Sequence, residues 1–99
     1  MAYLLIFADA ARDHLRDMTA RQRSLILATI HEQLTHQPAV ETKNRKLLRP
    51  NPIAPWELRI GTIRVFYEIR LESEEVWIEA IGIKVRDRVR IGGQEVEFP

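Results

Sequence analysis

The chain of 99 residues contains no cysteine, which excludes disulfides, thiolate metal sites and cysteine nucleophiles. It also has no apolar run long enough to span a membrane. The apolar start, MAYLLIF, lacks a basic leader and a small-residue cleavage site, so we do not expect a signal peptide. These absences are typical of a cytoplasmic protein, and the length predicts a single domain over residues 1–99.

Glycine and histidine are scarce, with four and three residues respectively. The sequence has no phosphate-binding glycine loop, no zinc-ligand spacing and no serine-based triad. His31 and His36 are five residues apart in a predicted helical region and so lie on different faces. Together with His14 they are expected to be ordinary helix-surface histidines, and neither a metal nor a cofactor is expected.

The net charge is only +1, but the basic residues are clustered. Residues 43–49, KNRKLLR, hold four basic side chains and no acidic one, and residues 84–90, KVRDRVR, hold four basic and one acidic. Either cluster alone is compatible with a solvated surface. If the two meet in space, they would form a basic patch for a nucleic acid or an acidic protein segment.

The most regular stretch of the sequence is residues 63–71, in which apolar and polar positions alternate strictly. A period of two over this length predicts a strand with one face on a core. The shorter run Trp56–Ile60 precedes it, and Gly61-Thr62 between the two predicts a tight hairpin. One face of the longer strand carries Ile63, Val65, Tyr67, Ile69 and Leu71, so Tyr67 is interpreted as structural.

The opposite face of this hairpin carries Arg59 and Arg64 on neighbouring strands, beside Phe66. Because the alternation turns Arg64 away from the core, we expect its guanidinium to be exposed. Two guanidinium groups on an open sheet face can bind a phosphate. The alternative is that they pair across strands with Glu57 or Glu68.

The other elements follow from capping and turn signals. Tyr3–Phe7 has strand length, and Asp9 is expected to cap a helix from Ala10 to about Met18. Thr19 and Gln22 form a capping box for a second helix, which Gln37-Pro38 should end.

The proline-rich segment 38–55 is irregular, with Leu47 and Leu48 expected to anchor it to the core. Glu75–Ile83 is a further strand, with a bulge expected near Gly82, and Gly92-Gly93 joins a C-terminal hairpin. This order predicts an α+β domain with a helical hairpin packed on a twisted antiparallel sheet.

Cleavage of RNA by its own 2′-hydroxyl needs a base, cations that stabilise the phosphorane, and an acid for the leaving oxygen. The basic candidates are Arg59, Arg64, Lys84 and Arg86. Lys84 shares its parity with the core residues Val76 and Ile78, so it reaches the open face only if Gly82 or the strand end breaks the phase.

The pattern "LR.G..RVFYEI", after a strand, two helices and a basic loop, resembles the RelE/ParE superfamily of type II toxins. The resemblance covers Tyr3 to about Arg88. It implies a small RelE-like fold and a cognate antitoxin. RelE-like members cleave mRNA in the ribosomal A site, whereas ParE-like members inhibit DNA gyrase.

The resemblance carries residues over only in part. Arg64 matches the strand arginine that stabilises the cleaved phosphate, Arg59 matches a basic position on the preceding strand, and Lys84 or Arg86 matches the arginine after the last core strand. From the two basic clusters we further expect RNA or the ribosome to contact Lys43, Arg45, Lys46, Arg49 and Arg88.

The departures from the family pattern concern the acid–base residues. RelE-like toxins carry lysines on the strand that enters the hairpin, and in this sequence those positions fall near Pro55 and Glu57. They also often carry a C-terminal tyrosine or histidine, and here Val89 to Ile91 and a Gly-Gly hairpin stand in its place. Either Lys43, Lys46 or a glutamate substitutes, or the protein is a ParE-like inhibitor or an inactive binding module. An acidic, amphipathic antitoxin segment is expected to cover Phe66 and Trp77 on the open face.

Overall fold

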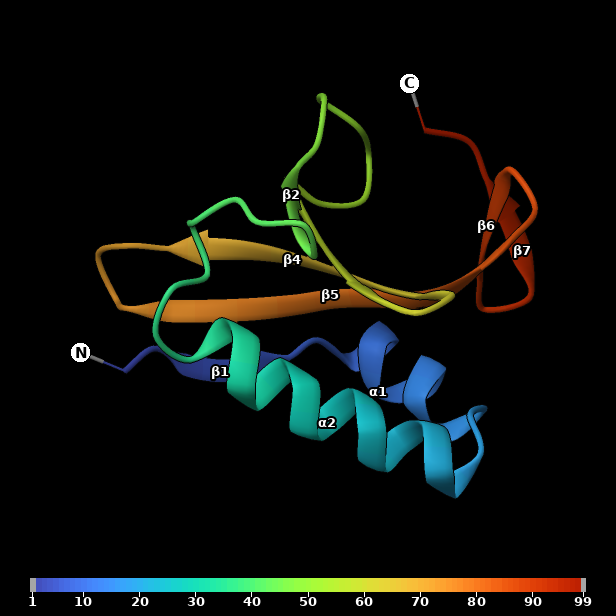
Figure 1. Ribbon diagram of the computed structural model, residues 1–99, viewed down its shortest axis with the longest axis horizontal. Coiled ribbons are helices and arrows are strands. Elements are labelled where there is room, and N and C mark those ends of the chain that lie inside the picture. Colours follow the sequence, from blue (N-terminus) through green and yellow to red (C-terminus); the bar gives the residue numbers. More distant parts are fainter. Residues whose placement is uncertain (1, 99) are drawn as a thin grey trace.

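The structure is a computed structural model that describes residues 2–98. Within these residues two helices pack on one seven-stranded sheet (Figure 1). The elements in chain order are β1 (Leu4–Phe7), α1 (Asp9–Arg16), α2 (Ala20–Leu34), β2 (Arg45–Leu47), β3 (Trp56–Ile60), β4 (Ile63–Arg70), β5 (Glu75–Val85), β6 (Arg88–Ile91) and β7 (Gln94–Val96). The predicted α+β class is therefore confirmed.

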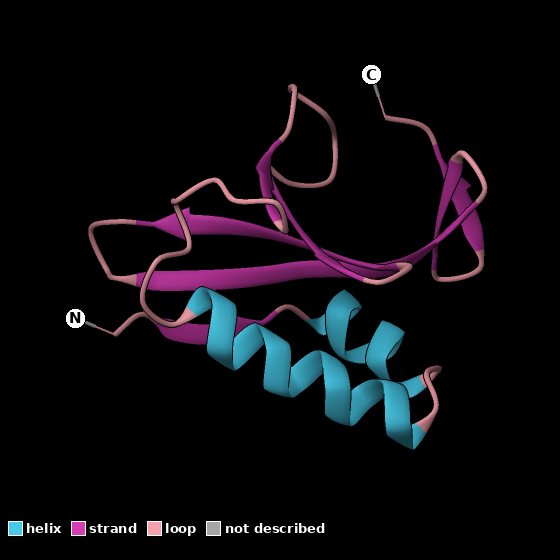
Figure 2. Cartoon of the chain, in the orientation of Figure 1, coloured by secondary structure: helices cyan, strands magenta, loops and turns pink. Residues whose placement is uncertain are grey.

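The sheet follows the order β2-β3-β4-β5-β6-β7 and is antiparallel along this path. β1 pairs in parallel with the first half of β5, and β6 pairs with its second half. Both helices lie on one side of the sheet, whereas the segment between β2 and β3 and the C-terminal hairpin rise on the other (Figure 2). We call these two sides the helix face and the outer face.

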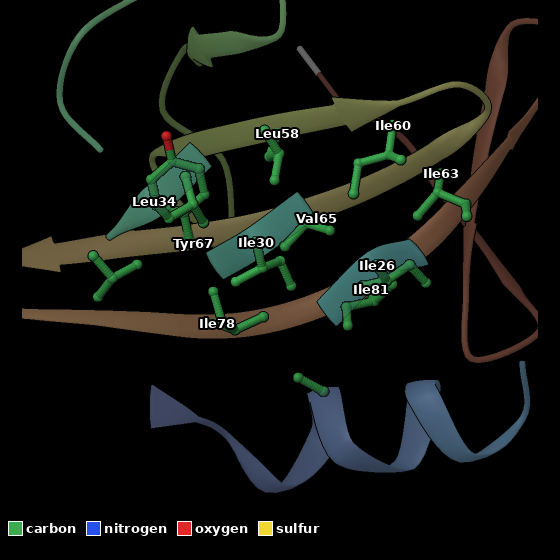
Figure 3. Packing of buried hydrophobic residues seen from close by; sticks show 12 residues of the cluster. Ile26, Ile30, Leu34, Leu58, Ile60, Ile63, Val65, Tyr67, Ile78 and Ile81 are labelled. Atoms are coloured by element: carbon green, nitrogen blue, oxygen red, sulfur yellow. The ribbon is translucent and has the colours of Figure 1, made fainter. Parts of the chain in front are cut away.

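The main core lies between the helix face and the two helices. α2 contributes one apolar stripe, Ile26, Ile30 and Leu34, and these side chains pack against Val65 and Tyr67 of β4 (Figure 3). Tyr67 is fully buried and its hydroxyl donates to the backbone carbonyl of Pro38 at 2.8 Å. The structural interpretation of Tyr67 is thus confirmed, because its polar end is satisfied inside the protein.

The two helices begin in different ways. For α2, the predicted capping box is present: Thr19 Oγ1 accepts from the Gln22 amide at 3.1 Å, and Gln22 Oε1 accepts from the Thr19 amide at 2.9 Å. For α1, the predicted Asp9 cap is wrong, because the cap position is Ala8 and has no side-chain hydrogen bond. Asp9 is instead the first helical residue, where its negative charge favours the helix N-terminus.

A bulge in β5 decides which side chains reach the outer face. Tyr67 pairs with Ile78 but Phe66 pairs with Ala80, so Glu79 is the extra residue. Beyond it the alternation is reversed, and Lys84 is placed on the outer face. The phase break required for Lys84 therefore exists, three residues before the predicted position at Gly82.

The outer face is not open at its centre, which corrects one expectation. Phe66 is fully buried in a second apolar cluster with Ala54 and Ala80, and the ring of Phe98 stacks on it at 5.1 Å between centroids. Of the two predicted anchors, Leu48 packs on this cluster, whereas Leu47 is 57% exposed. No helix within residues 2–98 is both long enough and apolar enough to cross a bilayer.

Candidate functional site

A cleft of ≈ 510 Å³ lies on the outer face, between the sheet and the C-terminal hairpin. We call it the outer cleft. Its floor comes from β3, β4 and the end of β5, and its far wall comes from residues 87–98. Its charged lining consists of four basic and four acidic residues: Arg59, Arg64, Lys84, Arg88, Glu57, Asp87, Glu95 and Glu97.

The strand register brings the basic residues of the floor together. Arg59 and Arg64 are direct cross-strand partners, as the hairpin predicted. Gly82 is the partner of Arg64 on β5. The amide of Lys84 donates to the carbonyl of Thr62 at 2.7 Å, which fixes the end of β5 against the β3–β4 turn.

Arg64 is held from within the turn. Its Nη1 donates to the carbonyl of Gly61 at 2.6 Å and to that of Ile63 at 3.0 Å, and the residue is only 9% exposed. The expected exposure of Arg64 is therefore wrong, because its side chain folds back onto the carbonyls of its own turn. Burial lowers the pKa of Arg64, Glu57 counteracts this, and Arg59 lowers the pKa further.

Glu57 is the carboxylate of the floor and is 7% exposed. Its Oε1 accepts from Arg59 Nε at 2.7 Å, a pair within β3 and not the cross-strand pair that the alternative predicted. Glu68 pairs with Arg70 instead of with Arg64. The site thus presents a buried carboxylate with two arginines, one paired with it and one held by backbone carbonyls.

The remaining predicted residues are dispersed. Lys84 lines the outer cleft, whereas Arg86 lies in the β5–β6 turn at φ 59°, exposed and outside the cleft lining. Arg88 also lines the cleft, but its Nη1 donates to Glu95 at 2.9 Å.

The basic loop is only partly available. Arg45 is 8% exposed: its Nε donates to the Val40 carbonyl and its Nη1 to Gln33, each at 2.9 Å. Its guanidinium is thus used inside the fold, which does not favour the RNA contact predicted for it. Lys46 lies opposite Glu57 on β2, while Lys43 and Arg49 are exposed outside the cleft.

His14 is another correction. Its Nδ1 accepts from the amide of Ile81 at 3.1 Å, in the part of β5 between the segments paired with β1 and β6. Burial lowers the pKa of His14, against the opposing effect of Asp13 and Asp17. It is therefore a structural acceptor and not an ordinary surface histidine.

Sequence reasoning missed the acidic wall of the cleft. Glu95 and Glu97 lie in the last strand and the tail, with Val96 and Phe98 at the intervening positions, and all four line the cleft. The signal was present as an acidic–apolar alternation at the C-terminus. It complements the basic–aromatic face that Arg64 and Phe66 form on β4.

Comparison with solved structures finds a chain in the crystal structure of the toxin–antitoxin complex RelBE2 from Mycobacterium tuberculosis. The TM-score is 0.74 and the sequence identity is 24%, over 85% of this chain and 93% of that chain. No protein-family model and no curated protein matches the sequence. At this identity the likeness concerns the fold, and the predicted RelE-like fold is confirmed.

Proposed function

We propose that this chain is the toxin of a type II toxin–antitoxin system and acts as a RelE-like, ribosome-dependent mRNA interferase. The observation that carries the proposal is the juxtaposition of Arg59, Arg64 and the buried Glu57 on the outer face of a RelE-like sheet. The partners that follow are a cognate antitoxin, the ribosome and mRNA, and the expected compartment is the cytoplasm. The likeness to a chain of a toxin–antitoxin complex supports the antitoxin.

Arg64 is suited to stabilise the phosphorane. Two backbone carbonyls hold its Nη1, so the side chain is positioned before a ligand arrives. Within residues 2–98 its Nε and Nη2 make no hydrogen bond, and these donors can face a phosphate oxygen. A preorganised donor aimed at developing negative charge is among the strongest catalytic devices in proteins.

Glu57 is the proposed base. Its carboxylate would take the proton from the 2′-hydroxyl as the 2′-oxygen attacks phosphorus, and Arg59 would hold the carboxylate in place through Oε1. The bond from phosphorus to the 5′-oxygen breaks, and Lys84 would donate a proton to that oxygen. The products are a 2′,3′-cyclic phosphate and a free 5′-hydroxyl. Glu57 thus fills the place of the base that the family pattern left open.

The second candidate function is ParE-like inhibition of DNA gyrase without cleavage. The ion pairs of the free protein favour this candidate, because they neutralise cations that cleavage would need: Arg59 pairs with Glu57, and Arg88 pairs with Glu95. With equal numbers of acids and bases, the cleft has a smaller attraction for a phosphate than four unpaired cations would have.

The test compares cleavage of a programmed mRNA, with and without ribosomes, for the wild type and for Glu57→Gln. We expect ribosome-dependent cleavage that Glu57→Gln slows roughly 10²–10⁴-fold, the usual contribution of a general base. The matched control is Glu68→Gln on the same outer face, which loses a carboxylate paired with Arg70. Intact mRNA together with blocked gyrase supercoiling would overturn the interferase assignment in favour of the second candidate.

A further inference from the structure

The wall of the outer cleft opposes its floor in charge. The floor carries Arg59, Arg64 and Lys84 against Glu57, a net charge of +2. The lining residues of the wall are Arg88 against three acids, Asp87, Glu95 and Glu97, a net charge of −2. The free protein therefore places an acidic surface opposite the cations that the proposed function assigns to a phosphate.

The wall is also attached to the outer face by apolar contacts. Phe98 stacks on the buried Phe66 with an angle of 14° between the ring planes. Val89 of β6 packs on the same apolar cluster. The carboxylate of Glu95 accepts from Arg88 at 2.9 Å and lies 3.9 Å from Arg90, so it neutralises cations of its own hairpin. Figure 1 shows β6 and β7 turned up from the end of β5, with the red segment after β7 bending back above the sheet.

We infer that residues 94–98 form an acidic cover over the basic floor of the outer cleft. This cover competes with a polyanion for the basic residues and must be displaced when a nucleic-acid strand enters. The inference rests on the proposed function, because it assigns regulation to the same cleft. It follows from the balance of charges: a phosphodiester that enters beside Arg64 meets Glu95 and Glu97 on the opposite wall. Like charges on opposite sides of the cleft repel each other, and the repulsion is relieved when the cover moves away.

The test measures the dissociation constant of a fluorescein-labelled ten-nucleotide oligouridylate by anisotropy at 0.1 M salt. Glu95→Gln/Glu97→Gln removes two negative charges with little change of shape, and we expect binding to tighten about 5- to 10-fold. The control is Glu32→Gln/Glu72→Gln, which changes the net charge equally at two exposed positions outside the cleft. Equal tightening in both pairs would mean that only net charge matters and would overturn the inference.

A second variant distinguishes a cover that is displaced by the ligand from a wall that binds the ligand. Phe98→Ala changes no charge but removes the stacking on Phe66, so a displaced cover predicts tighter binding by a few-fold. Weaker binding would make Phe98 part of the ligand site and would overturn the inference.

Inorganic polyphosphate, used as a second probe, distinguishes failure of the cover from failure of the proposed function. If the glutamate double variant tightens polyphosphate binding while no RNA is bound, the cover stands and the RNA target falls. If the double variant binds neither probe, the cover itself is refuted.

Discussion

Replacing Arg64 by alanine should damage both stability and catalysis, and the two effects can be separated. The guanidinium donates to two carbonyls of the β3–β4 turn and is 9% exposed. A hydrogen bond from a charged group contributes about 1.5–3 kcal/mol, and water can reach the exposed turn in the variant, so we expect a loss of about 2 kcal/mol. For a domain of this size that lowers the melting temperature by roughly 8–16 °C.

The catalytic loss should exceed what unfolding explains. If Arg64 stabilises the phosphorane, Arg64→Ala should cut mRNA roughly 10²–10³-fold more slowly per folded molecule, and Arg64→Lys should be intermediate. The assay is ribosome-dependent cleavage at a temperature at which denaturation curves show the variants to be folded.

Arg70→Ala is the matched control, because Arg70 lies on the same face of β4 but pairs with Glu68 and stacks on Trp77. It should lose roughly 0–2 kcal/mol and no cleavage rate. A folded Arg64→Ala protein that cleaves at the wild-type rate would remove Arg64 from the active site.

Two further predictions concern the fold. Tyr67→Phe leaves the buried carbonyl of Pro38 without its donor, so thermal unfolding should show a loss of roughly 1–3 kcal/mol with unchanged cleavage per folded molecule; an unchanged melting temperature would contradict this. The lowered pKa of His14 means that, below the unfolded-state pKa of about 6.5, the unfolded chain binds more protons than the folded one. Urea unfolding should therefore show stability falling as the pH drops from about 7.5 until the folded pKa is passed, and less so in His14→Gln; parallel pH profiles would refute the assignment.

The β3–β4 hairpin could be predicted closely from the sequence because its signals are local. The alternation and Gly61 locate Trp56–Ile60 as observed and Ile63–Leu71 to within one residue. The start of α1 could not be predicted in this way, because a contact with a distant strand sets it. The Ala8 amide donates to the Ile78 carbonyl of β5 at 2.9 Å, and the chain turns into the helix there. β2 was missed because three residues carry no periodicity, and β3 supplies its partner.

The candidate site shows the same division. Arg59 and Arg64 were paired correctly because a two-residue turn fixes their register. The burial of Arg64 depends on its side chain folding back onto the carbonyls of Gly61 and Ile63, and the alternation of the strand does not report that conformation. The orientation of Lys84 depends on the register between β4 and β5. The sequence of β5 alone does not distinguish the bulged residue Glu79 from any other outward-facing residue, so the bulge could not be located from it.

Two local features of β5 account for the cleft. The bulge at Glu79 turns Lys84 to the outer face, where it joins the arginines. Gly82 then allows the close approach of β6, since a Cβ atom there would lie 2.5 Å from the carbonyl oxygen of Arg90. The first feature supplies a cation and the second brings in the hairpin with its acids. Because they are three residues apart on one strand, a change that shifts the β5 register would alter the basic floor and its acidic cover together.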